Sequence, residues 1–214
     1  MLKVVVFDSG YGGELFADYF EEALPVVEVI RVIDWRNADK IQQNAKLARK
    51  LAEQALRPYI NKVDLIIFAN YLVSIAHLKY FRRKYKHQNF LGIKLNHPSN
   101  FRQRTCIFTT KPIAKTISCR RFAHSLKAKI FTLDDWPILI DDGELGHAKI
   151  RHDLAPAIER KPTQIILACS QFVELEDEFR RIFGHNLKIV DNFDETTRQA
   201  CRLLRVRGSL KKQK

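Results

Sequence analysis

Short apolar runs alternate along the chain with longer stretches in which apolar residues recur at helical spacing. The runs have the length of strands and cover residues 2–7, 27–33, 64–69, 105–110, 129–133, 164–169 and 187–190. Because buried strands of parallel sheets read as nearly continuous apolar segments, this pattern predicts parallel strands joined by helices. The expected fold class is therefore α/β, with functional side chains at the carboxyl ends of the strands.

Helices are expected in most of the intervening stretches. The longest is predicted over 39–59, where Ile41, Ala45 and Ala48 have helical spacing and Pro58 marks the end. The first helix should follow the YGG sequence, near Glu14. The others are expected near 73–86, 112–126, 145–160, 171–183 and 194–205.

One internal repeat is visible. DLIIFAN at 64–70 and QIILACS at 164–170 are both apolar runs that end in a polar turn, and Cys169 stands where the first copy has Ala69. Between them, KLNHPSNFRQR at 94–104 is rich in Asn, Pro and Ser and is the best internal boundary. The pattern predicts two similar α/β halves that meet across a cleft.

The composition fits a globular protein. No apolar stretch approaches the ~20 residues of a membrane helix, and MLKVVVFDSG enters a strand without a signal-peptide pattern, so we expect a cytoplasmic protein without a membrane partner. Cys106, Cys119, Cys169 and Cys201 show neither CxxC pairing nor metal-ligand spacing. They indicate reduced thiols rather than disulfides or a zinc site.

The formal net charge of +13 makes an anionic partner worth considering. Basic residues concentrate at 82–87 and in the tail at 202–214. A solvated helix face and a frayed tail are the simpler explanation of these runs. A polyanion such as nucleic acid is the alternative, although no nucleic-acid-binding motif accompanies the charge.

Two polar residues end the first strand. VVVFDSGYGG places Asp8 and Ser9 there, followed by glycines that would let backbone amides approach a ligand. A helix beginning after Gly13 would favour a carboxylate or phosphate nearby. A local turn and helix cap explain the same residues equally well.

Cys169 is the strongest single candidate for chemistry. It follows an apolar strand and precedes a helix, whose dipole is expected to lower the thiol pKa and favour a thiolate that serves as base or nucleophile. A buried structural cysteine is the plain alternative. A pairing in space with His147 or His152 is a further option. Thr109 and Thr110 lie at the end of the fourth strand. Their hydroxyls could bind a carboxylate or could serve as ordinary strand-end caps.

Five segments together resemble glutamate racemase, in that family's order and over nearly the whole chain. They are FDSGYGG at 7–13, IIFANYLVSIA at 66–76, IFTTKPIAKTIS at 107–118, WPILIDDGE at 136–144 and ILACSQF at 166–172. The resemblance extends to the aspartate/glutamate racemase superfamily. It implies two pseudo-symmetric α/β domains with parallel sheets, an active-site cleft between them and no cofactor. One domain would hold residues 1–95 and 194–214, and the other residues 96–193.

The resemblance also implies roles for individual residues. In the family, two cysteines face opposite sides of the substrate α-carbon, and one removes the proton while the other returns it. Asp8 and Ser9 match the pair that assists the base and contacts the substrate amine. The other matches are Asn70 to the Asn of ACNT, Thr110 to the carboxylate-binding Thr, and Cys169 and Ser170 to the Cys-Thr of GCTH.

Several positions depart from the family pattern. Ala69 replaces the first cysteine, Tyr71 the Thr of ACNT, Gln171 the His that partners the second cysteine, and Ile113 a second Thr. The family's PYG loop is not recognisable after Asp34. Because racemisation needs proton donors on both faces of the substrate, the two-base reaction is predicted to be lost.

Three functions fit this sequence. The leading one is a racemase-like protein that binds a small carboxylate or amino acid in the cleft, with turnover left open. The second is a one-cysteine carbon-acid enzyme, such as a decarboxylase or isomerase, in which Cys169 is the proton donor. The third is an inactive scaffold whose basic surface binds a polyanion. A homodimer is a further partner to consider in each case.

Overall fold

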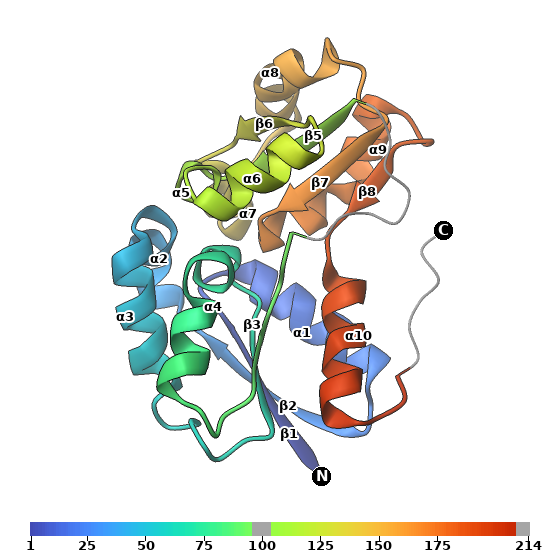
Figure 1. The fold of residues 1–214 in the computed structure, drawn as a ribbon. Helices are drawn as coiled ribbons and strands as arrows, with labels where there is room; N and C mark the ends of the chain where they lie inside the picture. Colours follow the sequence, from blue (N-terminus) through green and yellow to red (C-terminus); the bar gives the residue numbers. More distant parts are fainter. Residues whose placement is uncertain (96–103, 209–214) are drawn as a thin grey trace.

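The computed structural model describes residues 1–95 and 104–208 (Figure 1). Two α/β halves follow one another along the chain. The first contains β1 (Leu2–Asp8), α1 (Tyr11–Ala23), β2 (Val27–Ile33), the 3-10 helix η1 (Trp35–Asn37), α2 (Ala38–Gln43), α3 (Ala45–Leu56), β3 (Leu65–Phe68), α4 (Tyr71–Lys84) and β4 (Phe90–Gly92). The second contains β5 (Thr105–Thr109), α5 (Lys111–Ala114), α6 (Ile117–Ser125), β6 (Lys129–Thr132), α7 (Trp136–Asp141), α8 (His147–Ile158), β7 (Gln164–Ala168), the 3-10 helix η2 (Ser170–Leu175), α9 (Glu176–Phe183) and β8 (Lys188–Val190), and α10 (Phe193–Leu204) follows it.

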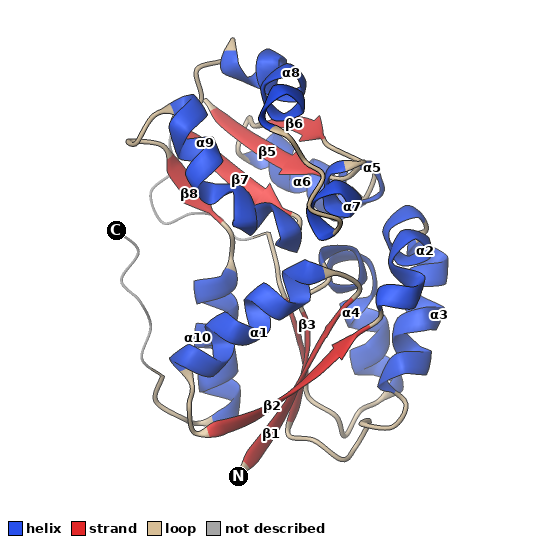
Figure 2. Ribbon diagram, turned by 180° about the vertical axis from the view of Figure 1, so that it is seen from behind, coloured by secondary structure: helices blue, strands red, loops and turns tan. Residues whose placement is uncertain are grey.

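Each half is built on a four-stranded parallel sheet. The strand orders are β2-β1-β3-β4 and β6-β5-β7-β8, so the two sheets have the same topology. Helices connect the strands, which confirms the predicted α/β fold class with parallel sheets (Figure 2). In the first sheet Phe7 pairs with Phe68, and in the second Thr109 pairs with Ala168. The carboxyl ends of the two central strands of each sheet therefore lie side by side.

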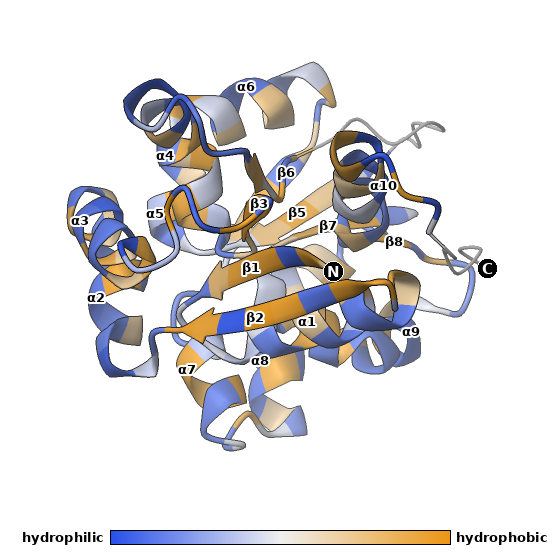
Figure 3. Cartoon of the chain, turned by 90° about the horizontal axis from the view of Figure 1, so that it is seen from below, coloured by the Kyte–Doolittle hydropathy of each residue, from blue (hydrophilic) through white to orange (hydrophobic). Residues whose placement is uncertain are grey.

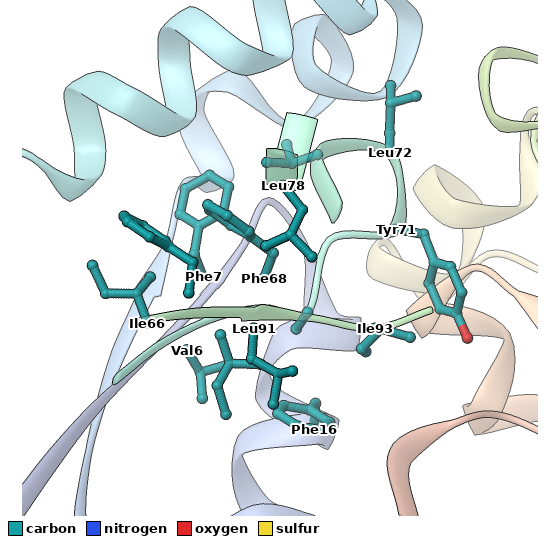
Figure 4. Packing of buried hydrophobic residues seen from close by; sticks show 14 of the residues in the cluster. Val6, Phe7, Phe16, Ile66, Phe68, Tyr71, Leu72, Leu78, Leu91 and Ile93 are labelled. Carbon is teal, nitrogen blue, oxygen red and sulfur yellow. The ribbon is translucent and has the colours of Figure 1, made fainter. Parts of the chain in front are cut away.

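Large apolar side chains hold each sheet to its helices. In the first half the buried rings of Phe7 and Phe68, on neighbouring strands, meet edge to face at 6.1 Å (Figure 4), and the ring of Phe68 lies 4.8 Å from that of Phe81 in α4. In the second half Phe108 stacks on Phe179 at 5.3 Å. Packing of this kind fixes the strand ends that carry the candidate site.

The last helix returns to the first half, as Figure 1 shows. Helix α10 contacts α1 and β4, and the ring of Phe193 lies 5.1 Å from that of Phe16. The domain limits inferred from the sequence stay a prediction. The proposed boundary loop at 94–104 lies largely outside the described residues, as does the end of the basic tail. Among the residues described, no helix is both long and apolar enough to cross a membrane.

The structure corrects the sequence prediction mainly at helix breaks. The helix expected over 39–59 is interrupted at Asn44, whose side chain accepts a hydrogen bond from Leu47 N and caps α3. The helix expected over 112–126 is likewise broken, because Thr116 caps α6. Strand β4 and helix α7 were not predicted. The first is only three residues long, and the second begins with the Trp136-Pro137 pair.

Candidate functional site

Hydrogen bonds bring the ends of strands from both halves together around Asp8. Its carboxylate accepts hydrogen bonds from Asn70 Nδ2 at 2.9 Å, from the Ser170 hydroxyl at 2.8 Å and from Ser9 N at 2.7 Å. Asn70 follows β3, whereas Ser170 lies 162 positions from Asp8 and follows β7. Four of the predicted site residues therefore form one buried network.

Asp8 is a buried carboxylate without a cation among its described partners. Asp8 is only 1% exposed to solvent. Its three hydrogen-bond donors are neutral groups of Asn70, Ser170 and Ser9. Burial raises the pKa of Asp8 from 3.8 to about 6, and the three hydrogen bonds only partly offset that effect. A buried anion in this position is suited to receive an ammonium group.

Asn70 is positioned by local structure. It is the N-cap of α4, and its Oδ1 accepts a hydrogen bond from Val73 N at 3.0 Å. That cap directs its Nδ2 toward Asp8 and toward the Ser9 hydroxyl, which lies 3.1 Å away. The amide orientation is thus fixed before any ligand arrives.

A small cavity lies between the halves beside this network. Its volume of about 20 Å³ leaves room for about one water molecule. Asn70, Thr110, Cys169 and Ser170 line it, together with Gln42, Tyr71 and Gln171. An amino acid would therefore need the halves to separate or the lining side chains to move.

Cys169 carries the only cavity-lining thiol among the described residues. Its Sγ donates a hydrogen bond to Gln171 Oε1 at 3.1 Å, and the residue is 6% exposed. Burial raises the pKa of the thiol well above its ordinary value, and the charge of Asp8 raises it further. The predicted thiolate is therefore wrong for this state, because burial outweighs the backbone N–H groups of η2 that lower the pKa.

The matching position in the first half is Ala69, which directly follows β3 and is fully buried. Its side chain has no ionisable group. Of these two matching strand ends, only the one after β7 has a thiol.

Neither suggested histidine belongs to this site. The exposed rings of His147 and His152 contact Glu178 and Asp153, each through Nδ1, and neither ring is among the described cavity-lining groups. The proposed Cys/His pair is therefore not formed.

The two threonines after β5 have different surroundings. Thr109 donates a hydrogen bond to Ala168 O at 3.0 Å, which ties β5 to β7. Thr110 lines the cavity, and its side chain makes no capping hydrogen bond with α5. Of the two, Thr110 is the one that can meet a ligand.

Tyr71 fills space between the halves. Its hydroxyl donates to Asp191 O at 2.7 Å and accepts from Asn192 Nδ2 at 3.1 Å, so the ring spans from α4 to the segment before α10. Figure 4 shows the ring pointing away from the packed side chains of Phe7 and Phe68. A threonine here, as in the family pattern, would leave a larger cavity.

The glycines after Ser9 serve contacts between the halves. A Cβ at Gly12 would collide with Ser170, and a Cβ at Gly10 would collide with Gln171 and Asp141. Helix α1 begins at Tyr11, earlier than predicted, and Tyr11 N donates to Asp141 Oδ1 at 3.0 Å. A carboxylate does lie at this helix N-terminus, but it belongs to the protein.

Sequence reasoning missed Gln42. It lies in α2, and its Nε2 is buried beside the cavity without a hydrogen-bond acceptor in the described part of the chain. An unpaired buried donor is costly, so it is a natural contact for a ligand oxygen. No motif in the sequence distinguishes Gln42 from its exposed neighbour Gln43.

No protein-family model and no curated protein matches this sequence. Solved structures do match. The glutamate racemase of Escherichia coli, in complex with L-glutamate and an activator, superposes with a TM-score of 0.83 at 19% identity, over 97% of this chain and 84% of that one. The glutamate racemase of Campylobacter jejuni gives 0.78 at 19% identity, over 100% and 89% of the two chains.

A more distant structure matches over a similar length. The aspartate racemase of Picrophilus torridus gives a TM-score of 0.60 at 12% identity, over 98% of this chain and 95% of that one. At sequence identities this low, structural similarity is evidence for a shared fold only. It confirms the fold that the sequence resemblance implied. The chain therefore shares its two-sheet α/β fold with these glutamate and aspartate racemase structures.

Proposed function

We propose that this protein is a divergent racemase-like protein that binds a small amino acid or related carboxylate between its two halves, and that it has lost two-base racemisation. The buried, cation-free carboxylate of Asp8 at the meeting point of the strand ends carries the proposal. The proposed domains are residues 1–95 with 194–214 and residues 96–193.

Recognition would use opposite charges at the two ends of the ligand backbone. The ammonium group would neutralise Asp8, whose burial makes an unpaired charge costly. The unpaired Nε2 of Gln42 and the hydroxyl of Thr110 line the same cavity and would donate to the carboxylate. Ser170, which bonds Asp8 across the two halves, would turn to the ligand when the halves separate, whereas Asn70 would keep its hydrogen bond to Asp8 within the first half.

The loss of racemisation follows from Ala69. A proton removed from one face of the α-carbon must be replaced from the other, and alanine has none to give. Losing one positioned acid or base typically costs ~10²- to 10⁴-fold in rate. Gln171 adds to this loss, because it accepts the Cys169 proton in a hydrogen bond and cannot remove it.

Calorimetric titration tests the binding proposal. The ligands are the two enantiomers of glutamate and of aspartate, together with glutarate and succinate, which lack the amine. Amino acids should bind more tightly than their deaminated counterparts, and Asp8→Asn should abolish that difference. Equal affinity for both groups, or no heat with any of them, would contradict the proposal.

A second function is favoured by the position of Cys169, which lines the cavity and whose pKa is raised by burial. A substituted malonic acid loses carbon dioxide with its bonding electrons left on the α-carbon, and a thiol can give its proton to that carbanion from one face. Water then reprotonates the thiolate. Release of carbon dioxide from such acids, with one solvent deuterium incorporated per turnover and both lost in Cys169→Ser, would support this function over simple binding.

A further inference from the structure

The positive charge of the chain originates in one stretch of sequence. No acidic residue occurs between Asp64 and Asp134, whereas residues 65–133 contain 14 of the 37 Lys and Arg residues. The rest of the chain has 23 basic residues and all 24 acidic ones, so it is close to neutral. Residues 65–133 therefore have a formal charge of +14, and the rest of the chain has −1.

The fold gathers part of this segment on one side of the molecule. Helix α4 of the first half contacts α6 of the second, and the two lie near each other in Figures 1 and 3. Helices α8 and α9 cover the opposite face of the second sheet from α6. Helix α9 begins with Glu176, Asp177 and Glu178, but Arg180 and Arg181 of the same helix pair with two of these acids, so its charges largely balance.

Five exposed cations on and next to these helices lack an acidic partner among the described residues. We call them the α4–α6 surface: Lys79, Arg83, Lys86, Arg120 and Arg121. Lys84 is different, because it forms an ion pair with Glu53. The five side chains therefore keep their full charge for an external partner.

The surface is hollowed beside α6. Ile117, Arg120, Arg121 and His124 line an open depression of about 330 Å³. Two adjacent guanidinium groups at such a depression offer forked donors, which match the oxygens of phosphate.

The residues of the α4–α6 surface favour one kind of anionic partner over a membrane or a single-stranded nucleic acid. Ile117, which is 61% exposed, is the only large exposed hydrophobic residue on α4 or α6, so the surface lacks the apolar anchors of a membrane-bound helix. Tyr80 and Tyr85 are only partly buried but are held by Glu53, so they do not form a platform for unstacked bases. We propose that the α4–α6 surface binds double-stranded nucleic acid through its phosphates, without reading the base sequence.

Fluorescence anisotropy with labelled DNA and RNA duplexes of about 20 base pairs tests this proposal. The logarithm of the association constant should fall linearly with the logarithm of the salt concentration. The slope should be near −0.9 for each phosphate contacted. The test variant replaces four cations of the surface, as Lys79→Gln, Arg83→Gln, Arg120→Gln and Arg121→Gln. The control makes the same change in charge at exposed positions elsewhere, as Arg57→Gln, Lys62→Gln, Arg151→Gln and Lys161→Gln.

The test variant should bind at least ~10²-fold more weakly at low salt, and its salt slope should be smaller by about 3 to 4, since each lost phosphate contact removes about 1. The control should retain most of the affinity and its slope. Circular dichroism verifies that both variants are folded. A variant that has lysine at all four positions, which keeps the charge, should have most of the affinity of the unaltered protein.

Several results would overturn the proposal. They are the absence of duplex binding at low salt, equal losses in the test and control variants, and equally tight binding of poly-glutamate, which has charge without phosphate. Binding to vesicles containing phosphatidylserine but not to duplexes would assign the surface to membranes instead. None of these outcomes bears on the cleft, because no residue changed here lines it.

Discussion

The Ser170 hydroxyl donates a 2.8 Å hydrogen bond to Asp8 Oδ2 and so joins the ends of β7 and β1 across the two halves. Both groups are among those proposed to face a ligand. In the closed state each satisfies the other, which removes the cost of leaving a buried polar group unpaired. Under the proposed function, ligand binding would replace this hydrogen bond as well as open the cavity.

The first prediction concerns pH. Asp8 has a pKa of about 6 in the folded protein and 3.8 as its ordinary value. Between these values the folded chain binds more protons than the unfolded chain, so the contribution of Asp8 to the free energy of unfolding falls as pH rises from about 4 to 6. The loss amounts to about 3 kcal/mol, at 1.36 kcal/mol per pKa unit.

Asp8→Asn should remove that contribution. The difference in unfolding free energy between variant and wild type, measured by urea denaturation, should move in favour of the variant as pH rises through this window. Asp191, whose burial also raises its pKa to about 6, is present in both proteins and cancels from the difference. Parallel pH profiles would show that Asp8 does not have a raised pKa.

The second prediction concerns the Tyr71 hydroxyl. Tyr71→Phe would leave the carbonyl of Asp191 and the Nδ2 of Asn192 without this partner. Because both groups lie in a buried segment, the free energy of unfolding should fall by about 1–3 kcal/mol. Tyr59→Phe is the control, since no hydrogen bond to its hydroxyl is described, and it should change stability by less than ~0.5 kcal/mol. Similar effects in the two variants would contradict the bridging role.

The third prediction concerns Gln42. Gln42→Met keeps the volume of the side chain and removes the unpaired Nε2, so the protein without ligand should be as stable as wild type or more stable. Affinity for an amino acid should fall by roughly 10-fold, as expected for one lost hydrogen bond to a charged group. The exposed neighbour offers the matched variant Gln43→Met, which should leave affinity unchanged. Equal affinities in both variants would exclude Gln42 from the site.

The sequence was sufficient for features that depend on local patterns. Seven strands were predicted to within about one residue, since apolar runs of buried parallel strands are distinctive, whereas the short strand β4 offers too few residues for a pattern. The breaks at Asn44 and Thr116 were missed because the helical spacing of apolar residues continues across both positions, from Ile41 to Ala45 and from Ile113 to Ile117.

The site shows the same division. Asp8 was identified from its strand end, and Asn70 and Ser170 from the family resemblance, and the structure brings the three together. The raised pKa of Cys169 was not predictable, because it depends on burial and on a carboxylate from the other half. Gln42 was missed for a related reason, as only the three-dimensional packing leaves its amide without an acceptor.

The last prediction concerns the missing base. The protein should not racemise glutamate or aspartate, because Ala69 leaves one face of the substrate without a proton donor. The variant Ala69→Cys, Tyr71→Thr, Gln171→His supplies that thiol, enlarges the cavity and gives Cys169 a partner able to accept its proton. A histidine at 171 would lie beside Asp141, whose carboxylate can stabilise the protonated ring.

Racemisation is followed by circular dichroism, and exchange of the α-proton with deuterated solvent is followed by NMR. The triple variant should gain both activities, and the new thiol would have Asp8 nearby to assist it. The double variant Tyr71→Thr, Gln171→His is the matched control. It has Cys169 as its one described cavity-lining thiol and should support exchange without inversion, because one thiol can remove and return a proton on the same face. Racemisation by the unaltered protein that disappears in Cys169→Ala would refute this account, since a second base would then have to act from the face that Ala69 occupies.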